Sequence, residues 1–273
     1  MKDALGDRMK GFYEDRYRIY LTRRMPVIIR VDGNAFHTFT RGLDKPFDHD
    51  FMKIMQKTCL SLCQNIQGCV GGYVQSDEIS LLLVDYQTIE SDAWFDYNLQ
   101  KITSLAAARA TMTFNDLVRR MVLDAENSAK IFEGVYKYNP ADEKYALAYR
   151  WYDKQGCAMF DARAFNIPKE EVCNYFIWRQ KDATRNSIQA AGQAQFSHKD
   201  LNGKSQSDIQ EMLFQKGINW NDYTIPEKRG SFVRRFTEKT ETEDGIVTVR
   251  HPWYIDDEMP ILTEDRNYIE DLI

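Results

Sequence analysis

The sequence predicts an α+β protein with a ferredoxin-like βαββαβ core and an α+β extension after it. Short apolar runs typical of strands alternate with longer segments in which apolar residues recur every three or four positions, as in amphipathic helices. Up to Pro168 the order is strand, helix, strand, strand, helix, strand. The pattern changes there, so we expect a core of residues 1–168 and a helical and hairpin part of residues 169–273.

The first half of the core contains three strands and the helix between the first two. A charged and aromatic stretch over residues 8–25 predicts a preceding helix, and Pro26 then starts the first strand. Apolar residues spaced by three and four over residues 47–66 predict an amphipathic helix. Residues 70–84 hold two β-rich runs around the polar residues 75–78, and therefore predict a hairpin.

The second half of the core contains one long helix and one strand. A pattern rich in alanine, leucine and methionine over residues 94–122 predicts the helix. Residues 157–167 alternate like a half-buried strand, which Pro168 ends. Polymerase palm domains and class III nucleotide cyclases use the same topology.

The extension is expected to contain two helices and two strands. Residues 169–195 have a helical pattern, and Ser207 with Gln210 resembles a capping box for a second helix that ends at Gly217. The expected strands and turn are residues 233–236, residues 245–253 and Asp244-Gly245.

The composition indicates a folded cytoplasmic protein. Hydrophobic residues make up 43% of the 273, which argues against disorder. No apolar run approaches the roughly 20 residues of a membrane span, and no apolar leader follows Met1, so no membrane contact is expected. The five cysteines lack paired spacing and are interpreted as reduced, buried thiols. A net charge of −5 argues against binding nucleic acid over the whole surface but permits a local basic face.

Two aspartates stand where apolar strands end. Asp32 follows the run of residues 27–31, and Asp77 lies in the connection of the hairpin. In a ferredoxin-like sheet strand 1 lies beside strand 3, so the two carboxylates are expected to converge. Mg²⁺ prefers one or two carboxylates plus phosphate oxygens, and the Gly33 carbonyl can add a ligand. The pair suggests phosphoryl or nucleotidyl transfer, although an aspartate after a strand is also a common turn residue.

The segment after Asp32 is suited to binding phosphate groups. Successive backbone N–H groups there can form a concave anion nest, and Lys45 supplies a cation nearby. The chain has no GxxxxGK[ST] motif, so the expected cradle is not a P-loop. The residues of the expected nest are Gly33, Asn34, Ala35, Phe36 and His37.

Two basic segments are candidates for contact with RNA. The helical pattern of residues 178–187 places Arg179 and Arg185 among aromatic and amide side chains, and arginines in such a setting can hold phosphates. Lys228 and Arg229 form a local basic cluster in an acidic chain. The alternative interpretation of both segments is a solvated surface without a ligand.

Together these motifs resemble the family of 3′-to-5′ nucleotidyltransferases related to tRNA-His guanylyltransferase. The combination of a strand followed by Asp-Gly-x-x-Phe-His with Gln-Ser-Asp-Glu is specific, and the motifs occur in the family's order. The matching segments are residues 29–37, 45–46, 73–80, 160–163 and 178–182, and Arg229-Gly230 resembles a later Lys-Gly segment.

The resemblance implies a palm-like catalytic core that adds nucleotides to the 5′ end of a tRNA. ATP or GTP first activates a 5′-monophosphate, and the 3′-hydroxyl of an incoming nucleoside triphosphate then attacks the activated end. By this resemblance Asp32, the Gly33 carbonyl and Asp77 hold two Mg²⁺ ions. Glu78 completes the motif. The implied nucleotide-binding positions are Asp32, Gly33, Asn34, Ala35, Phe36, His37, Lys45, Ser76 and Asp77.

One segment departs from the family pattern. Guanylyltransferases that add G to tRNA-His carry HINNLYN after the Trp-Arg-Gln segment, whereas residues 184–190 read TRNSIQA and keep only Asn186. The chain therefore resembles the guanylyltransferase-like branch of bacteria, archaea, phages and some eukaryotes, which implies template-dependent repair of 5′-truncated tRNAs. The family forms dimers of dimers, so we expect a homo-oligomer in which residues 169–273 contribute to nucleotide and tRNA binding.

Two other functions remain open. A nucleotide cyclase would use the same topology and aspartates, but would not account for residues 178–182. A non-catalytic RNA-binding module usually places stacking aromatic residues on its central strands. The central strands here are apolar instead, with carboxylates at their ends.

Overall fold

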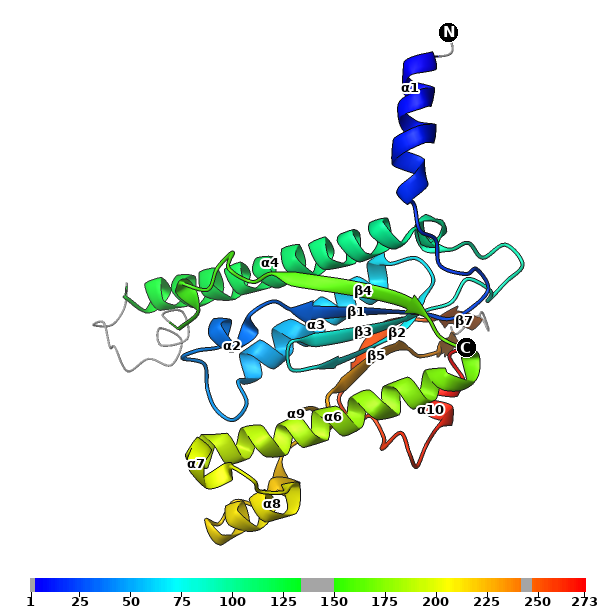
Figure 1. Ribbon diagram of the computed structural model, residues 1–273. Coiled ribbons are helices and arrows are strands. Elements are labelled where there is room, and N and C mark those ends of the chain that lie inside the picture. Colours follow the sequence, from blue (N-terminus) through cyan, green and yellow to red (C-terminus); the bar gives the residue numbers. More distant parts are fainter. Residues whose placement is uncertain (1–2, 134–149, 242–246) are drawn as a thin grey trace.

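The computed structural model describes residues 3–133, 150–241 and 247–273, and a six-stranded sheet forms its centre (Figure 1). The strand order is β4-β1-β3-β2-β5-β8, and every neighbouring pair is antiparallel. The strands of this sheet are β1 (Val27–Gly33), β2 (Cys69–Gln75), β3 (Glu78–Leu83), β4 (Phe160–Asn166), β5 (Ser231–Arg235) and β8 (Trp253–Asp256).

The predicted α+β class and the order of the core elements are confirmed. α3 (His49–Asn65) connects β1 to β2, the β2–β3 hairpin follows, and α4 (Leu99–Glu133) precedes β4. α3 and α4 cover one face of the sheet, whereas α6 (Lys169–Gln195) covers the other (Figure 1). The sheet is therefore buried on both faces.

Side chains along β1 alternate between the two faces of the sheet. Val27, Ile29 and Val31 belong to the core beneath α3 and α4, and Ile28 belongs to the core beneath α6. Because successive strand residues point to opposite faces, Arg30 and Asp32 lie on the same face as Ile28, the face covered by α6. Polar residues at this end of β1 therefore face α6.

The contact between α3 and β2 depends on a missing side chain. A Cβ atom at Gly72 would lie 2.7 Å from the Cys59 sulfur and 2.8 Å from the Cys63 sulfur. Both cysteines are buried free thiols, as predicted, and burial raises the pKa of the Cys63 thiol. These two cysteines therefore serve packing rather than chemistry. Of the five cysteines expected to be buried, Cys157 is exposed instead.

The extension contributes two strands to the sheet. β5 pairs with β2, with Val233 opposite Gly72, and β8 pairs with β5. The strand predicted for residues 233–236 overlaps β5, but the one predicted for residues 245–253 corresponds to β7 (Val247–Arg250) rather than β8, and the place of β5 and β8 in the sheet was not predicted. Asp244-Gly245 lies outside the described residues, between β6 (Glu238–Glu241) and β7, which pair with each other. A division of the chain at residue 168 stays a prediction.

The N-terminal helix differs from the prediction in both bounds. Helical structure runs through α1 (Ala4–Met9), a π-helical turn (Lys10–Glu14) and a 3₁₀ turn (Asp15–Tyr17), and then stops. The chain leaves the helix because Ile19 and Leu21 form backbone hydrogen bonds with Leu99 and Tyr97. These long-range partners override the local helical pattern.

Two other predicted helix starts were wrong. α4 begins at Leu99 rather than residue 94, because positive φ angles at residues 95–97 break the helix and the Asn98 side chain caps it by accepting from the Lys101 N–H. The extension's second helix, α8 (Gln206–Gln215), is capped by Ser205 with Asp208 rather than by Ser207. Gly217, in the left-handed conformation, follows its end as predicted.

The remaining helices are short: they are α2 (Phe36–Phe39), α7 (His198–Leu201), α9 (Ile225–Arg229), α10 (Asn267–Glu270) and the 3₁₀ turns Trp94–Tyr97 and Trp220–Asp222. None of the helices in the described ranges, long or short, has the length and apolar character of a membrane span.

Candidate functional site

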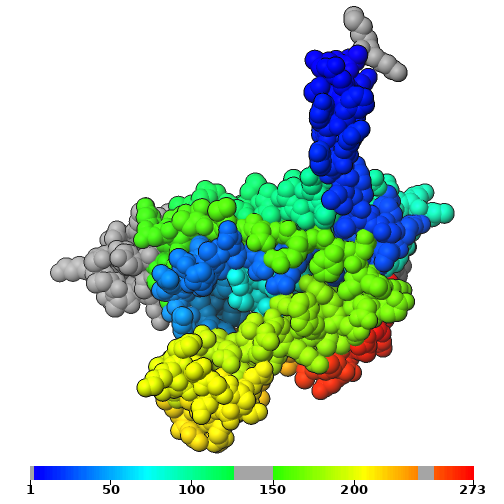
Figure 2. Space-filling model, viewed as in Figure 1, coloured from blue at the N-terminus to red at the C-terminus, as the bar shows by residue number. Residues whose placement is uncertain are grey.

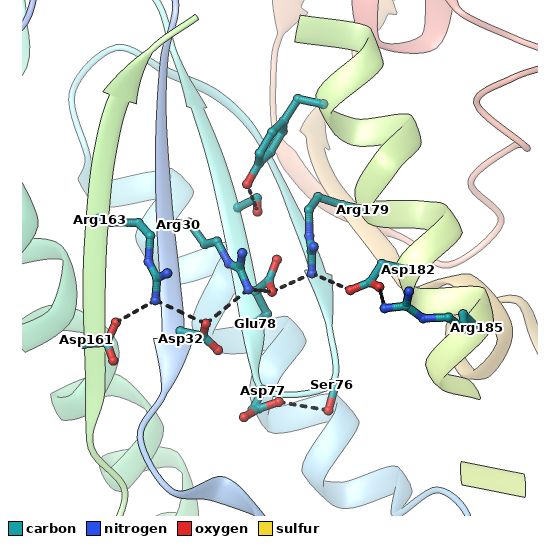
Figure 3. A network of polar contacts seen from close by, with 12 residues as sticks. Arg30, Asp32, Ser76, Asp77, Glu78, Asp161, Arg163, Arg179, Asp182 and Arg185 are labelled. Atoms are coloured by element: carbon teal, nitrogen blue, oxygen red, sulfur yellow. Dashed lines mark hydrogen bonds and ion pairs between the residues drawn. The ribbon is translucent and has the colours of Figure 1, made fainter. Parts of the chain in front are cut away.

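The sheet brings the two predicted catalytic aspartates to the same end of neighbouring strands. In the pairing of β1 with β3, Asp32 lies opposite Glu78, and the Gly33 N–H donates to the Asp77 carbonyl oxygen at 3.0 Å. Figure 3 shows Asp32 beside the turn that carries Ser76 and Asp77. The convergence expected from the topology is therefore present in the backbone pairing itself.

Asp77 is a half-buried carboxylate that forms no ion pair with any described residue. Burial raises the pKa of Asp77, the Ser76 hydroxyl that donates to its Oδ1 at 3.0 Å lowers it, the nearby Asp32 charge raises it again, and the more distant Arg30 charge lowers it. Among the residues that the structure describes, no ion pair reaches Asp77. Its charge is thus left for a cation from outside the chain.

Asp32 is held by two arginines. Its Oδ2 lies 3.2 Å from Arg30 Nη2 and 3.5 Å from Arg163 Nη2, and the carboxylate is half-buried. Arg163 reaches across from β4, where Asp161 lies opposite Asp32 in the strand pairing. The arginines fix the Asp32 carboxylate beside Asp77.

Glu78 is gripped between two arginines from different elements. Arg30 of β1 and Arg179 of α6 both donate to its Oε2, the latter at 2.6 Å, and Glu78 is only 4% exposed. Burial raises the pKa of Glu78, whereas the two guanidinium groups lower it. Its other oxygen, Oε1, has no hydrogen-bond partner among the described residues. Glu78 is therefore a structural anion rather than a free metal ligand.

The donor set at this site fits Mg²⁺. Among the described residues, no group of three or more His, Cys, Asp or Glu side chains has the arrangement of a metal cage. Mg²⁺ rarely needs such a cage, because it is usually bound by one or two carboxylates together with substrate phosphates and waters. Asp32 and Asp77 supply two carboxylates, and the Gly33 carbonyl lies at the same strand end.

The segment after Asp32 has the backbone form expected of an anion nest, with one exception. Ala35 adopts the left-handed conformation, with φ of +56°, and α2 starts at Phe36. The Asn34 N–H already donates to the Met159 carbonyl at 2.8 Å, so it is not available to a ligand. The backbone N–H groups of residues 35–37 have no hydrogen-bond partner among the described residues.

Within this segment Asn34, Ala35 and His37 are exposed, whereas Phe36 is buried. The Phe36 ring is buried in an aromatic cluster with Phe51, Phe114 and Phe160. A Cβ atom at Gly33 would lie 2.4 Å from that ring. Glycine is therefore needed here for packing against Phe36.

A cleft of about 230 Å³ opens beside the turn of Ser76. It lies between α3, the β2–β3 turn, α6 and α9, and Lys45 stands at its wall. Its lining combines apolar side chains with about as many polar and charged ones, among them Asp44, Asp48 and Glu227. Lining residues include Phe51, Met55, Val74, Ala183, Asn186, Ser187, Ala190 and Pro226.

The four candidate RNA-binding residues differ in accessibility. Arg179 is 2% exposed and is tied to Glu78 and Asp182, so it does not face the solvent as an RNA contact would. Arg185 is exposed and forms an ion pair with Asp182. Lys228 and Arg229 are half-buried at the end of α9, where the Lys228 ammonium donates to the Asn221 carbonyl.

Sequence reasoning missed the roles of Arg30 and Arg163. Figure 3 shows them in one network that runs from Asp161 to Arg185 across β4, β1, β3 and α6. A signal was present, because Arg30 is a charged residue inside an otherwise apolar strand and stands two positions before Asp32.

We expect the Arg179→Met variant to lower the free energy of unfolding by roughly 3 kcal/mol, because it leaves the buried Glu78 charge with one partner instead of two. Denaturation by urea measures this loss. Arg185→Met is the matched control and should stay within about 0.5 kcal/mol, since its ion pair is exposed. Equal effects of the two changes would contradict this account of Glu78, whereas adding Glu78→Gln to Arg179→Met should recover part of the loss.

Solved structures similar to this chain include two whose alignments span 99% of this chain and 99% of their own length. One is a bacterial tRNA(His) guanylyltransferase (Thg1)-like protein in complex with ATP, 40% identical with a TM-score of 0.79. The other is a bacterial protein of the same description in complex with GTP, 39% identical with a TM-score of 0.75.

Comparison of sequences agrees. A probable tRNA(His) guanylyltransferase of Dictyostelium discoideum is 24% identical over 83% of this chain and 82% of its own length. The family model described as tRNAHis guanylyltransferase matches residues 6–168, which is more than half of the chain. The chain therefore belongs to the tRNAHis guanylyltransferase (Thg1) family of nucleotidyltransferases.

Proposed function

We propose that the protein is a Mg²⁺-dependent 3′-to-5′ nucleotidyltransferase that repairs the 5′ ends of tRNAs. It would first activate a 5′-monophosphate with ATP or GTP, and then add nucleotides that a template strand selects. The observation that carries this proposal is the convergence of Asp32 with Asp77, whose half-buried carboxylate has no cationic partner among the described residues.

Asp32, Asp77 and the Gly33 carbonyl would hold two Mg²⁺ ions. When bound, the metal supplies charge neutralisation of the phosphates and alignment of the attacking and leaving oxygens. The chain's own part is to hold the two carboxylates in place. Arg30 and Arg163 do this for Asp32, and the Ser76 hydroxyl does it for Asp77.

The nucleoside triphosphate would lie between the nest and the cleft. The backbone N–H groups of residues 35–37 and the Ser76 hydroxyl would bind its phosphates, and Lys45 would add a positive charge. The base and ribose would enter the cleft beside Ser76. The ATP and GTP complexes of the two bacterial relatives, which are 40% and 39% identical to this chain, support either nucleotide as activator.

The segment that departs from the family pattern supports repair over a dedicated guanosine addition. Residues 184–190 lie on α6, and Asn186, Ser187 and Ala190 line the cleft. A change of residue types on this wall alters the surface that a nucleotide would contact. Arg185, Lys228 and Arg229 would contribute to tRNA binding, in a cytoplasmic homo-oligomer arranged as a dimer of dimers.

The Asp32→Ala and Asp77→Ala variants should each slow 5′ extension of a 5′-truncated, labelled tRNA by about three orders of magnitude or more, because each removes a carboxylate from the metal site. The assay supplies ATP, nucleoside triphosphates and Mg²⁺, and gel electrophoresis measures the product.

Asp116→Ala serves as the control for these variants, because Asp116 pairs with Arg119 and Arg120 on α4, away from the site. It should extend tRNA at the wild-type rate. Extension by Asp77→Ala at that rate, or no extension by the wild type, would refute the proposal. Release of a cyclic nucleotide from ATP or GTP without RNA would favour a cyclase instead.

A second prediction follows from the raised pKa of Asp77. Because this pKa is higher in the folded than in the unfolded chain, the folded chain binds more protons between the two values, and the free energy of unfolding falls as the pH rises through that window. At neutral pH Asp77 is ionised in both states, so the full loss of unfolding free energy is present there. Without metal, Asp77→Asn should therefore raise the melting temperature measured at pH 7.

Metal should stabilise the wild type far more than the Asp77→Asn variant. Mg²⁺ with ATP should raise the melting temperature of the wild type, since ligands that bind only the folded state stabilise it, but should barely shift Asp77→Asn. Asp161→Asn is the matched control, because Asp161 is exposed and already paired with Arg163. A metal shift that survives in Asp77→Asn would place the cation elsewhere.

A further inference from the structure

The first residues of the described chain form an arm whose helical residues are not buried by any other part of the chain that the structure describes. We define the N-terminal arm as residues 3–18, which contain α1 and the two helical turns after it. Figures 1 and 2 show α1 projecting away from the rest of the molecule. No residue of these helical segments is buried.

The base of the arm is fixed, although the arm itself is free. Leu21 and Leu99 form backbone hydrogen bonds with Tyr97 and Ile19, at 3.0 and 2.8 Å. Arg23 follows directly and is bound to Asp85, a fully buried carboxylate, at 2.8 Å. The arm therefore leaves the body from an anchored position and presents its side chains outwards.

One side of the arm carries a stripe of large apolar side chains. Their spacing of three and four is that of an amphipathic helix, which normally buries such a stripe. A helix of this length is marginal in water unless it packs against a partner. The exposed fractions are Leu5 57%, Met9 43%, Phe12 58%, Tyr13 61% and Tyr17 73%.

The charges of the arm disfavour RNA as the partner. Basic residues (Arg8, Lys10, Arg16 and Arg18) and acidic residues (Asp3, Asp7, Glu14 and Asp15) are equal in number, so the arm has no net charge. The Arg18 guanidinium is also neutralised within the arm, by Glu14 at 2.8 Å and Asp15 at 3.0 Å. Binding to a phosphate backbone depends on excess positive charge.

The order of charges along the arm is complementary to that of a second arm running in the opposite direction. Along the arm an acidic pair, a basic pair, an acidic pair and a basic pair follow one another. Two arms side by side in the same direction would bring like charges together. Two arms in opposite directions would place every acidic pair against a basic pair, around a shared apolar stripe. Such self-complementarity is what a two-fold symmetric contact requires.

We propose that the N-terminal arm is a self-association element that pairs antiparallel with the arm of a second copy of this chain. The pairing buries the stripe of Leu5, Met9, Phe12, Tyr13 and Tyr17 from both copies. This proposal rests on the homo-oligomer of the proposed function and assigns a contact surface to it. Its test measures the mass of the assembly rather than nucleotide addition, so a failure of the arm pairing is distinguishable from a failure of the proposed activity.

Sedimentation velocity of the full-length chain tests the apolar part. The wild type should associate, and Phe12→Ser combined with Tyr17→Ser should raise the dissociation constant at least about tenfold. Ile89→Ser combined with Phe214→Ser is the matched control, because these side chains are 91% and 65% exposed outside the arm. Unchanged association of the arm variant, or an equal loss in the control, would overturn the proposal.

Charge reversal tests the antiparallel direction. Asp7→Arg and Arg16→Glu should each weaken association, and the two changes together should restore it, because opposite ends of the arms then again carry unlike charges. Failure of the double variant to recover would overturn the antiparallel pairing. Arm variants that keep wild-type association but lose tRNA binding would show an RNA contact and would equally overturn it.

Discussion

The structure depends on the two ion pairs that Arg30 and Arg179 form with the buried Glu78 carboxylate. Arg30 comes from β1, Glu78 from β3 and Arg179 from α6, so one buried carboxylate joins the two central strands to the helix that covers them. This contact fixes the position of the turn that precedes β3. Since Asp77 is in that turn, the neighbouring ion pairs fix the geometry of the candidate metal site. Arg179 of α6 thereby helps to position Asp77.

The contrast between the three carboxylates at this edge indicates a division of tasks. Glu78 pairs with Arg30 and Arg179 through Oε2 only, Asp32 pairs with Arg30 and Arg163, and Asp77 has no cationic partner among the described residues. An enzyme that binds a divalent cation with its substrate must keep some negative charge uncompensated until then. The cost appears as the raised pKa of Asp77, and the cation would remove that cost on binding.

Much of the fold follows from local sequence pattern, and the errors follow from long-range contacts. α6 begins and ends at the predicted residues, and the hairpin of β2 and β3 lies where two β-rich runs around the polar residues 75–78 predicted it. The convergence of Asp32 with Asp77 was predictable because strand order alone requires it. The burial of Arg179 was not, because an arginine on an amphipathic helix looks solvent-exposed until its partner is known, and Glu78 is 101 residues away. The end of the N-terminal helix depends in the same way on a distant partner, Tyr97.

The central claim is that Asp32 and Asp77 form the metal site while Glu78 stays with its arginines. A crystal structure with Mn²⁺ and a non-hydrolysable ATP analogue tests it most directly, because Mn²⁺ gives an anomalous signal at oxygen-ligand sites that Mg²⁺ also occupies. We predict anomalous peaks bonded to the carboxylates of Asp32 and Asp77 and to phosphate oxygens, with Glu78 still bound to Arg30 and Arg179. Peaks away from this pair, or a Glu78 that leaves its arginines to ligate the metal, would contradict the account.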